Sequence, residues 1–351
     1  MTTSTLRATR APAPSRGGDW RAREGRMPAR GEMRAGEVPW RGRRVEAVYE
    51  PREPVDVGLT LGVLPRGTHD PTMWRNPATG DWWRVTRTPE GLATLVIRPT
   101  RHGARLVAFG DGAERAIASA PELLGRGDDW SGLDPRTLPP PLAEAWRRHP
   151  GLHLTRTGAV FESLAPTILE QKITTLEARR AWRYLHRRFA VAAPGPEGLV
   201  PRHLRAPLSP EEWRAIPVWE WHRAGVDLSR RSTLQRAAGA AAGLERTLEL
   251  GRGSEEVTAR LRSIPGVGVW TAAETTQRSH GDPDAPSFGD YHLAGHITWA
   301  LSGEIGDDFA AAALLETWRG HRQRVVRLIG LARGGKPRRG PRMTVEDHRD
   351  R

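Results

Sequence analysis

The chain has 351 residues, with 54 Lys and Arg against 41 Asp and Glu, a formal net charge of +13 and no cysteine. This length suffices for two domains with cores of their own plus terminal tails. The lack of cysteine excludes a disulfide framework. No apolar run approaches the roughly 18 residues of a membrane helix, so we expect no membrane partner. The arginine-rich N-terminus lacks the apolar segment of a secretory signal, which favours a cytoplasmic location.

The positive charge is concentrated at the two ends of the chain. Residues 1–45 contain 11 Arg against 4 acidic residues, residues 331–351 contain 7 Lys and Arg against 3, and the body between them has 36 basic and 34 acidic residues. Basic tails raise the non-specific affinity for nucleic acid and its salt dependence. Binding by the body would need local patches, such as the arginines at 179–188 and 319–327, although such runs are more often solvated helix faces.

The first third of the chain combines a tail with strand patterns. Residues 1–45, rich in Arg, Gly, Pro and Ala, are predicted to be disordered. Strand patterns at 55–63, 82–86, 93–98 and 105–109, followed by a helix at 113–124, predict a small antiparallel α+β domain over 46–140. Three consecutive prolines within 134–141 indicate the linker that ends this domain.

Helical periodicity dominates residues 141–333, and a basic tail follows at 334–351. The fold class is therefore α+β, with an all-helical region after the small N-terminal domain. The predicted helices are 141–149, 159–168 running on through 175–189, 210–215, 218–224, 228–244, 253–263, 269–279, 290–301 and 309–331.

A glycine-containing turn separates two of these helices at residues 264–269, Ile-Pro-Gly-Val-Gly-Val. Gly266 and Gly268 can adopt backbone conformations that strain other residues. We expect successive N–H groups to converge there, at the positive end of the next helix, and to bind an anionic oxygen such as a phosphate. The alternative is an ordinary corner between two helices. The turn is not a dinucleotide fingerprint, because Thr271 replaces the third glycine.

The run Ile-Pro-Gly-Val-Gly-Val-Trp-Thr-Ala, followed about twenty residues later by Phe-Gly-Asp-Tyr-His, resembles the helix-hairpin-helix DNA glycosylases. Within that superfamily it is most similar to the alkylation-repair branch, the 3-methyladenine DNA glycosylase II type. A second block, residues 161–174, is similar to the early helix that reaches the gap left by a displaced nucleotide. The resemblance covers residues 155–333. It implies a monomeric enzyme, nucleoid-associated and of bacterial type, whose partner is double-stranded DNA with a damaged base.

The carboxylate of the second motif is Asp290, which the resemblance makes the catalytic residue. Breaking a base–sugar bond builds positive charge on the sugar, which a fixed carboxylate stabilises while it orients or deprotonates water. Asp290 also suits the N-cap of the helix that follows, and both roles are compatible. Asp282 and Asp284 are rival carboxylates in a proline-containing loop, but neither matches the motif.

The residues around the motif define the expected chemistry. Lyase-type relatives carry a lysine where this chain has Trp270, and the only lysines here are Lys172 and Lys336. The chain also lacks the cysteines of an iron–sulfur cluster. We therefore expect a monofunctional enzyme that uses water and has no lyase activity.

The resemblance also supplies a base pocket. Trp270 would stack on the extruded base, although a core tryptophan is the plainer interpretation. Glu274 stands where alkylation glycosylases often have an aromatic residue, and it would either attract a cationic base or face solvent. Tyr291 and Trp318 complete the predicted pocket.

The predicted DNA-binding residues come from two segments. The hairpin contributes Pro265, Gly266, Val267, Gly268 and Val269, and the early helix contributes Gln171 and Lys172. The alkyl chain of Lys172 would fill the gap that the extruded base leaves in the stack, and its ammonium group would contact a phosphate. The alternative is an exposed helix residue.

No metal site is predicted from the side chains. His292 and His296 have the spacing of helical metal ligands, but no glutamate, cysteine or third ligand accompanies them. The resemblance allows a monovalent cation, Na⁺ or K⁺, on the backbone carbonyls of 264–269, and no other cofactor is expected.

These observations together predict an enzyme of base excision repair that extrudes alkylated purines from duplex DNA and hydrolyses the N-glycosidic bond, leaving an abasic site. One alternative is an oxidised-base or mismatch glycosylase on the same fold. Another is a catalytically inactive helix-hairpin-helix DNA-binding protein.

Overall fold

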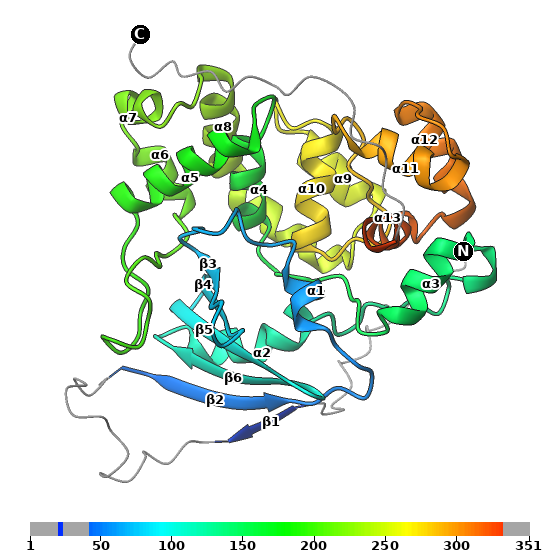
Figure 1. The fold of residues 1–351 in the computed structure, drawn as a ribbon. Helices are drawn as coiled ribbons and strands as arrows, with labels where there is room; N and C mark the ends of the chain where they lie inside the picture. The colour runs from blue at the N-terminus through cyan, green and yellow to red at the C-terminus, as the bar shows by residue number, and fades with distance from the viewer. Residues whose placement is uncertain (1–19, 24–41, 333–351) are drawn as a thin grey trace, which may run out of the picture.

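The computed structural model describes residues 20–23 and 42–332. Six antiparallel strands form one sheet in the order β1-β2-β6-β5-β4-β3 (Figure 1). The strands are β1 Trp20–Arg23, β2 Arg44–Tyr49, β3 Met73–Arg75, β4 Trp82–Thr88, β5 Gly91–Thr100 and β6 Gly103–Phe109. Helices make up most of the remaining chain. The predicted α+β class, with the sheet before the helical region, is confirmed.

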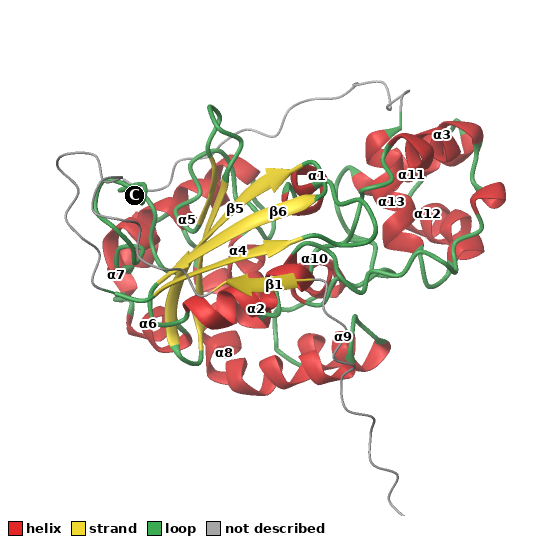
Figure 2. Ribbon diagram, turned by 90° about the horizontal axis from the view of Figure 1, so that it is seen from below, coloured by secondary structure: helices red, strands yellow, loops and turns green. Residues whose placement is uncertain are grey.

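The sheet is covered on both faces because its strands alternate apolar residues on each side. Leu95 and Ile97 pack on one face with the helices α1 Val57–Leu61 and α2 Ala113–Leu123. Val96 and Val107 pack on the other face against a loop that carries Leu204. Figure 2 shows α2 lying along one face of the strands.

Two expectations for this region are wrong, and two strands were not predicted. The tail predicted to be disordered contains β1, whose backbone pairs with β2 from Trp20↔Tyr49 to Arg23↔Glu46. The predicted strand at 55–63 is helical, because Asp56 caps α1 by accepting a hydrogen bond from Leu59 N at 2.9 Å. The strands β2 and β3 had no clear signal. Residues 24–41 and the tail at 334–351 lie outside the described residues.

The helical region contains two cores. The first is formed by α4 Val160–Leu169, α5 Thr175–Phe189, α6 Pro210–Ala215, α7 Val218–Arg223, α8 Leu228–Glu245, α9 Glu255–Arg262 and α10 Val269–Ser279. The second is formed by α3 Pro140–Arg148, α11 Leu293–Ser302, α12 Asp308–Leu315 and α13 Arg322–Leu331. Three short 3₁₀ turns lie next to these helices in the described residues: η1 Pro135–Thr137 before α3, η2 Arg246–Leu250 between α8 and α9, and η3 Glu316–Trp318 between α12 and α13. None of the described helices is long and apolar enough to cross a bilayer.

Two helices predicted as continuous are interrupted. The helix predicted to run from 159 to 189 breaks after α4, where Lys172 has a left-handed φ of 56° and Thr174 opens α5 with a capping box. The helix predicted at 309–331 divides into α12, η3 and α13, with Gly320 at φ 86°. Both breaks change which side chains face the region between the two cores.

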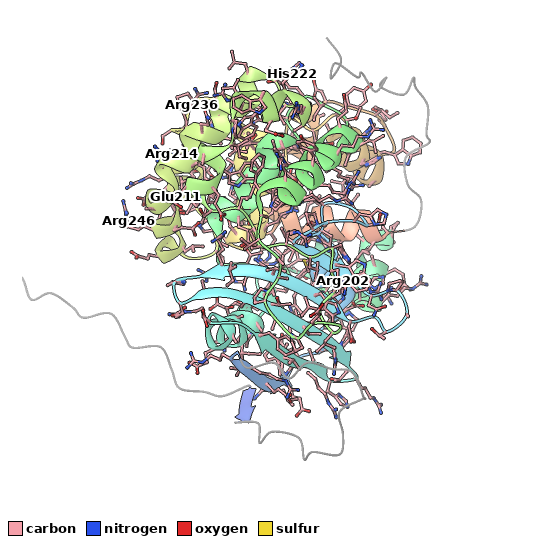
Figure 3. All side chains as sticks on the ribbon, turned by 90° about the vertical axis from the view of Figure 1, so that its left-hand side faces the viewer. Arg202, Glu211, Arg214, His222, Arg236 and Arg246 are labelled. Carbon is pink, nitrogen blue, oxygen red and sulfur yellow. The ribbon has the colours of Figure 1, made fainter. Side chains whose placement is uncertain are left out.

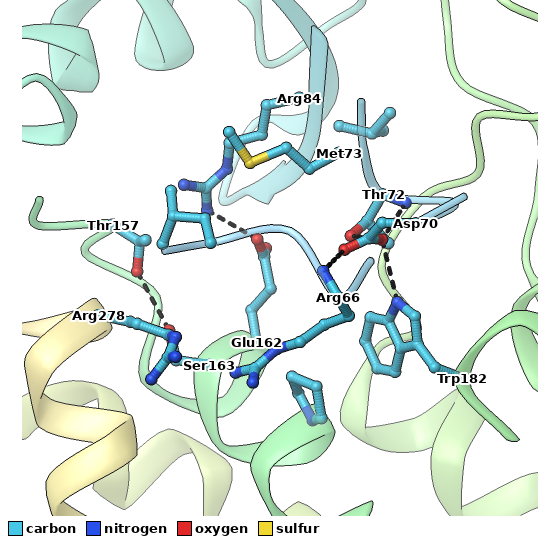
Figure 4. Close-up of a pocket in the computed structure, with 13 residues that line it drawn as sticks. Arg66, Asp70, Thr72, Met73, Arg84, Thr157, Glu162, Ser163, Trp182 and Arg278 are labelled. Atoms are coloured by element: carbon cyan, nitrogen blue, oxygen red, sulfur yellow. Dashed lines mark hydrogen bonds and ion pairs between the residues drawn. The ribbon is translucent and has the colours of Figure 1, made fainter. Parts of the chain in front are cut away.

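Buried ion pairs join the sheet to the helices. Arg66 bonds Glu170 at 2.6 Å, and Arg84 bonds Glu162 at 2.7 Å. The indole of Trp182 donates to Asp70 at 3.0 Å. Figure 4 shows these side chains, apart from Glu170, around a small polar cavity. The sheet and the first helical core are therefore held together by charged contacts shielded from water.

Candidate active site beside the hairpin

The predicted hairpin is present between α9 and α10. Gly266 adopts φ +98°, and a Cβ there would lie 2.1 Å from Thr233 Oγ1. Gly268 has the extended angles φ −91° and ψ −175°, and a Cβ there would meet nothing within 4 Å. The expectation that both glycines supply special backbone conformations is therefore right only for Gly266. At Gly268 the missing side chain leaves open space at the start of α10.

The hairpin is braced from both sides. Gln171 Nε2 donates to Gly266 O at 2.9 Å and to Thr271 Oγ1 at 2.8 Å. Arg236 Nε, from α8, donates to Pro265 O at 3.0 Å. Figure 3 shows Arg236 along one edge of the helical region with Arg214 and Arg246. Gln171 therefore supports the hairpin itself, whereas Lys172 beside it is exposed.

The exposed part of the hairpin is its turn. Pro265, Gly266, Gly268 and Val269 are exposed, while Val267 is buried in the first core. No side chain caps α10. Because the first N–H groups of a helix have no intrahelical partner, they are available to a ligand.

Asp290 lies directly before α11 and is half-buried. Its Oδ1 accepts hydrogen bonds from His292 N at 2.8 Å and Leu293 N at 3.0 Å. Asp290 therefore bonds the first amide of the helix, as a capping residue would, although α11 begins at Leu293 and its N-cap position is His292 rather than Asp290. Both bonds fix the carboxylate on the helix end.

A hollow with an empty volume of about 440 Å³ lies beside Asp290, between α10 of the first core and α11 and α13 of the second. The hollow is adjacent to the hairpin, since a Cβ on Gly289 would lie 3.7 Å from Trp270 Cβ. Its lining residues are Glu274, Gln277, Ser287, Asp290, His292, Leu293, His296, Gln323 and Val326. The two motifs of the sequence thus meet at one site.

This arrangement can be compared with known proteins. No protein-family model and no curated protein matches the chain. Solved structures do match it, and the chain has the fold of the helix-hairpin-helix DNA glycosylases. The 3-methyladenine DNA glycosylase from Archaeoglobus fulgidus superposes with a TM-score of 0.64 at 18% identity, over 82% of this chain and 96% of that one.

Two further glycosylases superpose to a similar extent. MBOgg1, solved with a low-affinity DNA ligand, gives a TM-score of 0.62 at 14% identity, over 85% of this chain and 98% of that chain. The 8-oxoguanine glycosylase/lyase of Clostridium acetobutylicum, solved with double-stranded DNA containing cytosine opposite 8-oxoG, gives 0.60 at 12% identity, over 84% and 96%. At these identities the likeness is one of fold.

Within this glycosylase fold, only one of the four predicted pocket residues lines the hollow. Glu274 lines the hollow, whereas half-buried Trp270 lies near Gly289 and is not among the lining residues. Tyr291 is 83% exposed, with its ring edge-on to His292. Trp318 belongs to the second core, where its Nε1 donates to Thr137 Oγ1 at 2.8 Å. The expected placement of Trp318 in the pocket is wrong, because the 3₁₀ turn η3 directs it inward.

Glu274 is fully engaged by protein groups. Its Oε2 accepts from Arg278 Nη1 at 2.7 Å, and its Oε1 accepts from the Ser287 hydroxyl. Burial acts to raise the pKa of Glu274, but Arg278, Ser287 and the charge of Arg66 outweigh burial and hold the pKa below its usual value. Glu274 is therefore an ionised, paired carboxylate, and the expectation that it faces solvent is wrong.

Three polar residues of the hollow, Gln277, Ser287 and Gln323, were not predicted. Gln323 is only 6% exposed, and its Oε1 has no hydrogen-bond partner within the described part of the chain. A buried amide oxygen without a partner is costly, which marks it as a group that a ligand would satisfy. No pattern in the sequence distinguishes Gln323, because the break before α13 is what turns it into the hollow.

The histidine pair forms one edge of the hollow. The rings of His292 and His296 are stacked, with their centroids 6.2 Å apart. Among residues 20–23 and 42–332, no group of three or more His, Cys, Asp or Glu side chains is arranged to hold a metal ion.

Proposed function

We propose that this protein is a monofunctional DNA glycosylase of base excision repair that hydrolyses the bond between a damaged purine and its deoxyribose in duplex DNA. The observation that carries the proposal is the position of Asp290. Its carboxylate is fixed on a helix end, at the edge of a hollow, next to a hairpin with open amides. DNA backbone and extruded base would therefore be held on either side of one carboxylate.

The mechanism follows from the Asp290 carboxylate. Both of its bonds go to Oδ1, which leaves Oδ2 to face the deoxyribose and the attacking water. At about 4 Å and an effective dielectric near 20, its attraction for the developing sugar cation is of order 4 kcal/mol, which corresponds to roughly a thousandfold in rate. Extruding the base costs a few kcal/mol, least for a damaged base.

The hairpin and Lys172 would hold the DNA around the extruded base. The uncapped amides of α10 suit a phosphate oxygen. Lys172 is exposed in a left-handed conformation, which costs a non-glycine residue of order 1 kcal/mol or more and is typical of functional positions. We propose that its stem fills the gap in the base stack.

Hydrolysis without strand cleavage is supported by the lysine count. A lyase needs an amine that attacks the sugar, and Trp270 occupies the position of that lysine. Of the two lysines, Lys336 lies outside the described residues and Lys172 is assigned to the gap. Water activated by Asp290 is then the nucleophile.

Alkylated purines are the substrates that we favour. The negative charge available to the hollow is the Asp290 carboxylate, because Glu274 is paired with Arg278, and no Lys or Arg lines the hollow. Such a lining favours a base that already carries positive charge, and a cationic base leaves without a strong acid to protonate it.

A second substrate class is favoured by Gln323. Its unpartnered buried amide would hydrogen-bond the edge of a neutral base, as in sites that reject analogues lacking the right donor. An oxidised purine is therefore the competing substrate. Gln323→Leu separates the two classes, because it should abolish release of an oxidised base and leave release of a cationic alkylated base nearly unchanged.

A lesion panel tests the proposed function. Purified protein is incubated with methylated genomic DNA and with duplexes carrying 8-oxoguanine or single mismatches, and free bases are identified by mass spectrometry. We expect methylated purines and intact abasic strands. Release of only 8-oxoguanine would move the substrate to the second class, strand nicking would contradict the hydrolytic mechanism, and absence of any free base would leave a DNA-binding protein.

The remaining expectations stay predictions. They are a monomeric, cytoplasmic, nucleoid-associated enzyme and a Na⁺ or K⁺ ion at the hairpin. The carbonyls of Pro265 and Gly266 already accept hydrogen bonds from Arg236 and Gln171. A cation would therefore depend on the other carbonyls of the 264–269 turn, and no step of the mechanism uses it.

A further inference from the structure

Both oxygens of the Glu274 carboxylate accept hydrogen bonds from protein side chains. Ser287 donates its hydroxyl to Oε1, and Arg278 Nη1 donates to Oε2 at 2.7 Å. The Glu274 and Arg278 side chains are only 17% and 14% exposed. A charged pair so well shielded and bonded has a defined geometry and exchanges poorly with solvent. Glu274 therefore acts on the protein side of the hollow.

Arg278 connects this pair to the N-terminal part of the molecule. Its Nε donates to Val63 O at 3.1 Å, and its Nη1 also donates to Glu274 O at 2.7 Å. Arg278 lies beside the small polar cavity at the junction of sheet and helices, which Arg66 also lines (Figure 4). Glu274 is thus held from behind by a guanidinium anchored outside the helical region.

On its other side, Glu274 holds the loop that leads to Asp290. Gln277 Nε2, one turn further along α10, donates at 2.7 Å both to Ser287 Oγ and to Ala285 O. Ser287 O in turn accepts a hydrogen bond from Asp290 N at 3.2 Å, which closes a tight turn. The Ser287 hydroxyl and Ala285 O are therefore contacts between α10 and this loop, and Ser287 is the one within the turn that carries the carboxylate.

The ends of the same loop are tied to the second core. Asp308 Oδ2, at the start of α12, accepts from Gly289 N at 2.8 Å. Arg322, at the start of α13, forms a two-pronged ion pair with Asp284, with Nε–Oδ1 at 2.8 Å and Nη2–Oδ2 at 2.6 Å. Because both ends of the loop are fixed, the contact between α10 and Ser287 sets how far the turn at Asp290 extends into the hollow.

We propose that Glu274 is a positioning residue, which sets the place of Asp290 by clamping Ser287 against α10. The expected effect of Glu274 on the rate of base release rests on the proposed function. Its expected effect on the loop rests only on the contacts described above. Displacing a reacting group by about 1 Å can cost on the order of 100-fold in rate. Supporting residues of this kind hold a catalytic group within a fraction of an ångström.

Glu274→Gln is the informative substitution. It keeps the size of the side chain, but it removes the negative charge that pairs with Arg278, and it obliges the Ser287 hydroxyl to accept a hydrogen bond instead of donating one. Ser287→Ala removes the contact from the loop side. The matched control is Glu90→Gln, which alters a surface ion pair with Arg115, 3.0 Å long, in the sheet region.

A double-mutant cycle with Asp290→Asn tests the proposal. Single-turnover base release and duplex affinity are measured on the best substrate of the lesion panel. We expect Glu274→Gln to slow release by about 10- to 100-fold with affinity within about twofold, and to have no further effect when Asp290 is already Asn. Glu90→Gln should change neither quantity. An equal slowing in both backgrounds would mean that Glu274 contacts the base, which overturns the positioning role.

Amide hydrogen exchange tests the clamp independently of any activity. Peptides covering 285–293 should exchange faster in Glu274→Gln and Ser287→Ala than in the wild type, and Glu90→Gln should match the wild type. Unchanged exchange in both loop variants would overturn the clamp. Faster exchange in a protein that releases no base from any lesion would instead refute the glycosylase proposal and leave the clamp standing.

Discussion

In the proposed mechanism Asp290 has two tasks, and each one falls to a different carboxylate oxygen. Oδ1 accepts the amide hydrogens of His292 and Leu293, and Oδ2 is left for the hollow. A capping carboxylate is restricted by the helix end to which it is bonded. The same bonds that begin α11 therefore keep the negative charge in one place, which is what electrostatic catalysis requires.

Asp290→Asn should separate these tasks. An asparagine Oδ1 accepts the same two amide hydrogens, so we expect the free energy of unfolding to change by less than about 1 kcal/mol. Base release should fall roughly a thousandfold, because the charge facing the sugar is gone. Free base is quantified by mass spectrometry, and urea unfolding provides the control. Equal release by both proteins would contradict the mechanism.

At this scale, prediction from sequence worked where the signal was local. The hairpin turn and the position of Asp290 ahead of a helix could be predicted because their neighbours in sequence are also their neighbours in space. Trp318 was misplaced and Gln323 was missed because the breaks around η3 set their directions. Those breaks depend on packing in the second core rather than on a local turn motif.

Among the elements, the hairpin shows how two glycines in one motif differ. Gly266 has a left-handed backbone and no room for a methyl group, whereas Gly268 has an extended backbone and open space. Folding therefore requires glycine at 266. The open space at Gly268 would instead serve the DNA that, in the proposed function, approaches the start of α10. This distinction gives two predictions of opposite kind.

Gly266→Ala should destabilise the protein. Its Cβ would lie 2.1 Å from Thr233 Oγ1, and φ +98° is unfavourable for alanine. We expect the free energy of unfolding to fall by about 1–3 kcal/mol, measured by urea denaturation followed by tryptophan fluorescence. A variant as stable as the wild type would show that the turn relaxes without cost.

Gly268→Val should leave stability nearly intact and weaken DNA binding. Valine tolerates the extended backbone at this position, and nothing in the protein obstructs its side chain. The branched side chain would cover the amides of α10, so affinity should fall for all duplex sequences alike, with a shallower dependence on salt. Fluorescence anisotropy across a salt series measures both, and unchanged affinity would remove the hairpin from the binding surface.

At the scale of the whole molecule, the site depends on three packed units. The hollow lies between two helical cores, and the N-terminal region reaches it indirectly through Arg278, which is bonded to Val63 O in the loop after α1. Buried charged and polar groups at these junctions make the assembly sensitive to pH.

His186 provides a measurable case. It is fully buried, its ring is tilted at 48° against that of Trp182 with centroids 3.8 Å apart, and burial lowers its pKa to about 4. The unfolded chain therefore binds more protons between pH 6.5 and 4, so the stability due to neutral His186 is complete above pH 6.5 and is lost as the pH falls toward 4.

The variant His186→Phe isolates this contribution. Between pH 7 and pH 5 the wild type should lose about 2 kcal/mol more than His186→Phe, as measured by urea unfolding at the two pH values. Phenylalanine keeps an aromatic ring against Trp182 and Trp213 and cannot be protonated. Parallel pH dependence in the two proteins would show that His186 does not titrate in this range.

The sequence by itself determined the α+β class, the hairpin turn and the carboxylate that follows it. These features rest on hydrophobic periodicity and on turn residues, which act over a few neighbouring positions. Only the tertiary structure decided that Glu274 is bonded to Arg278 and Ser287, that Trp318 is buried, and that Gln323 reaches the hollow. Those outcomes depend on contacts between segments far apart in the chain, where burial and hydrogen-bond partners, rather than residue type, assign each side chain its role.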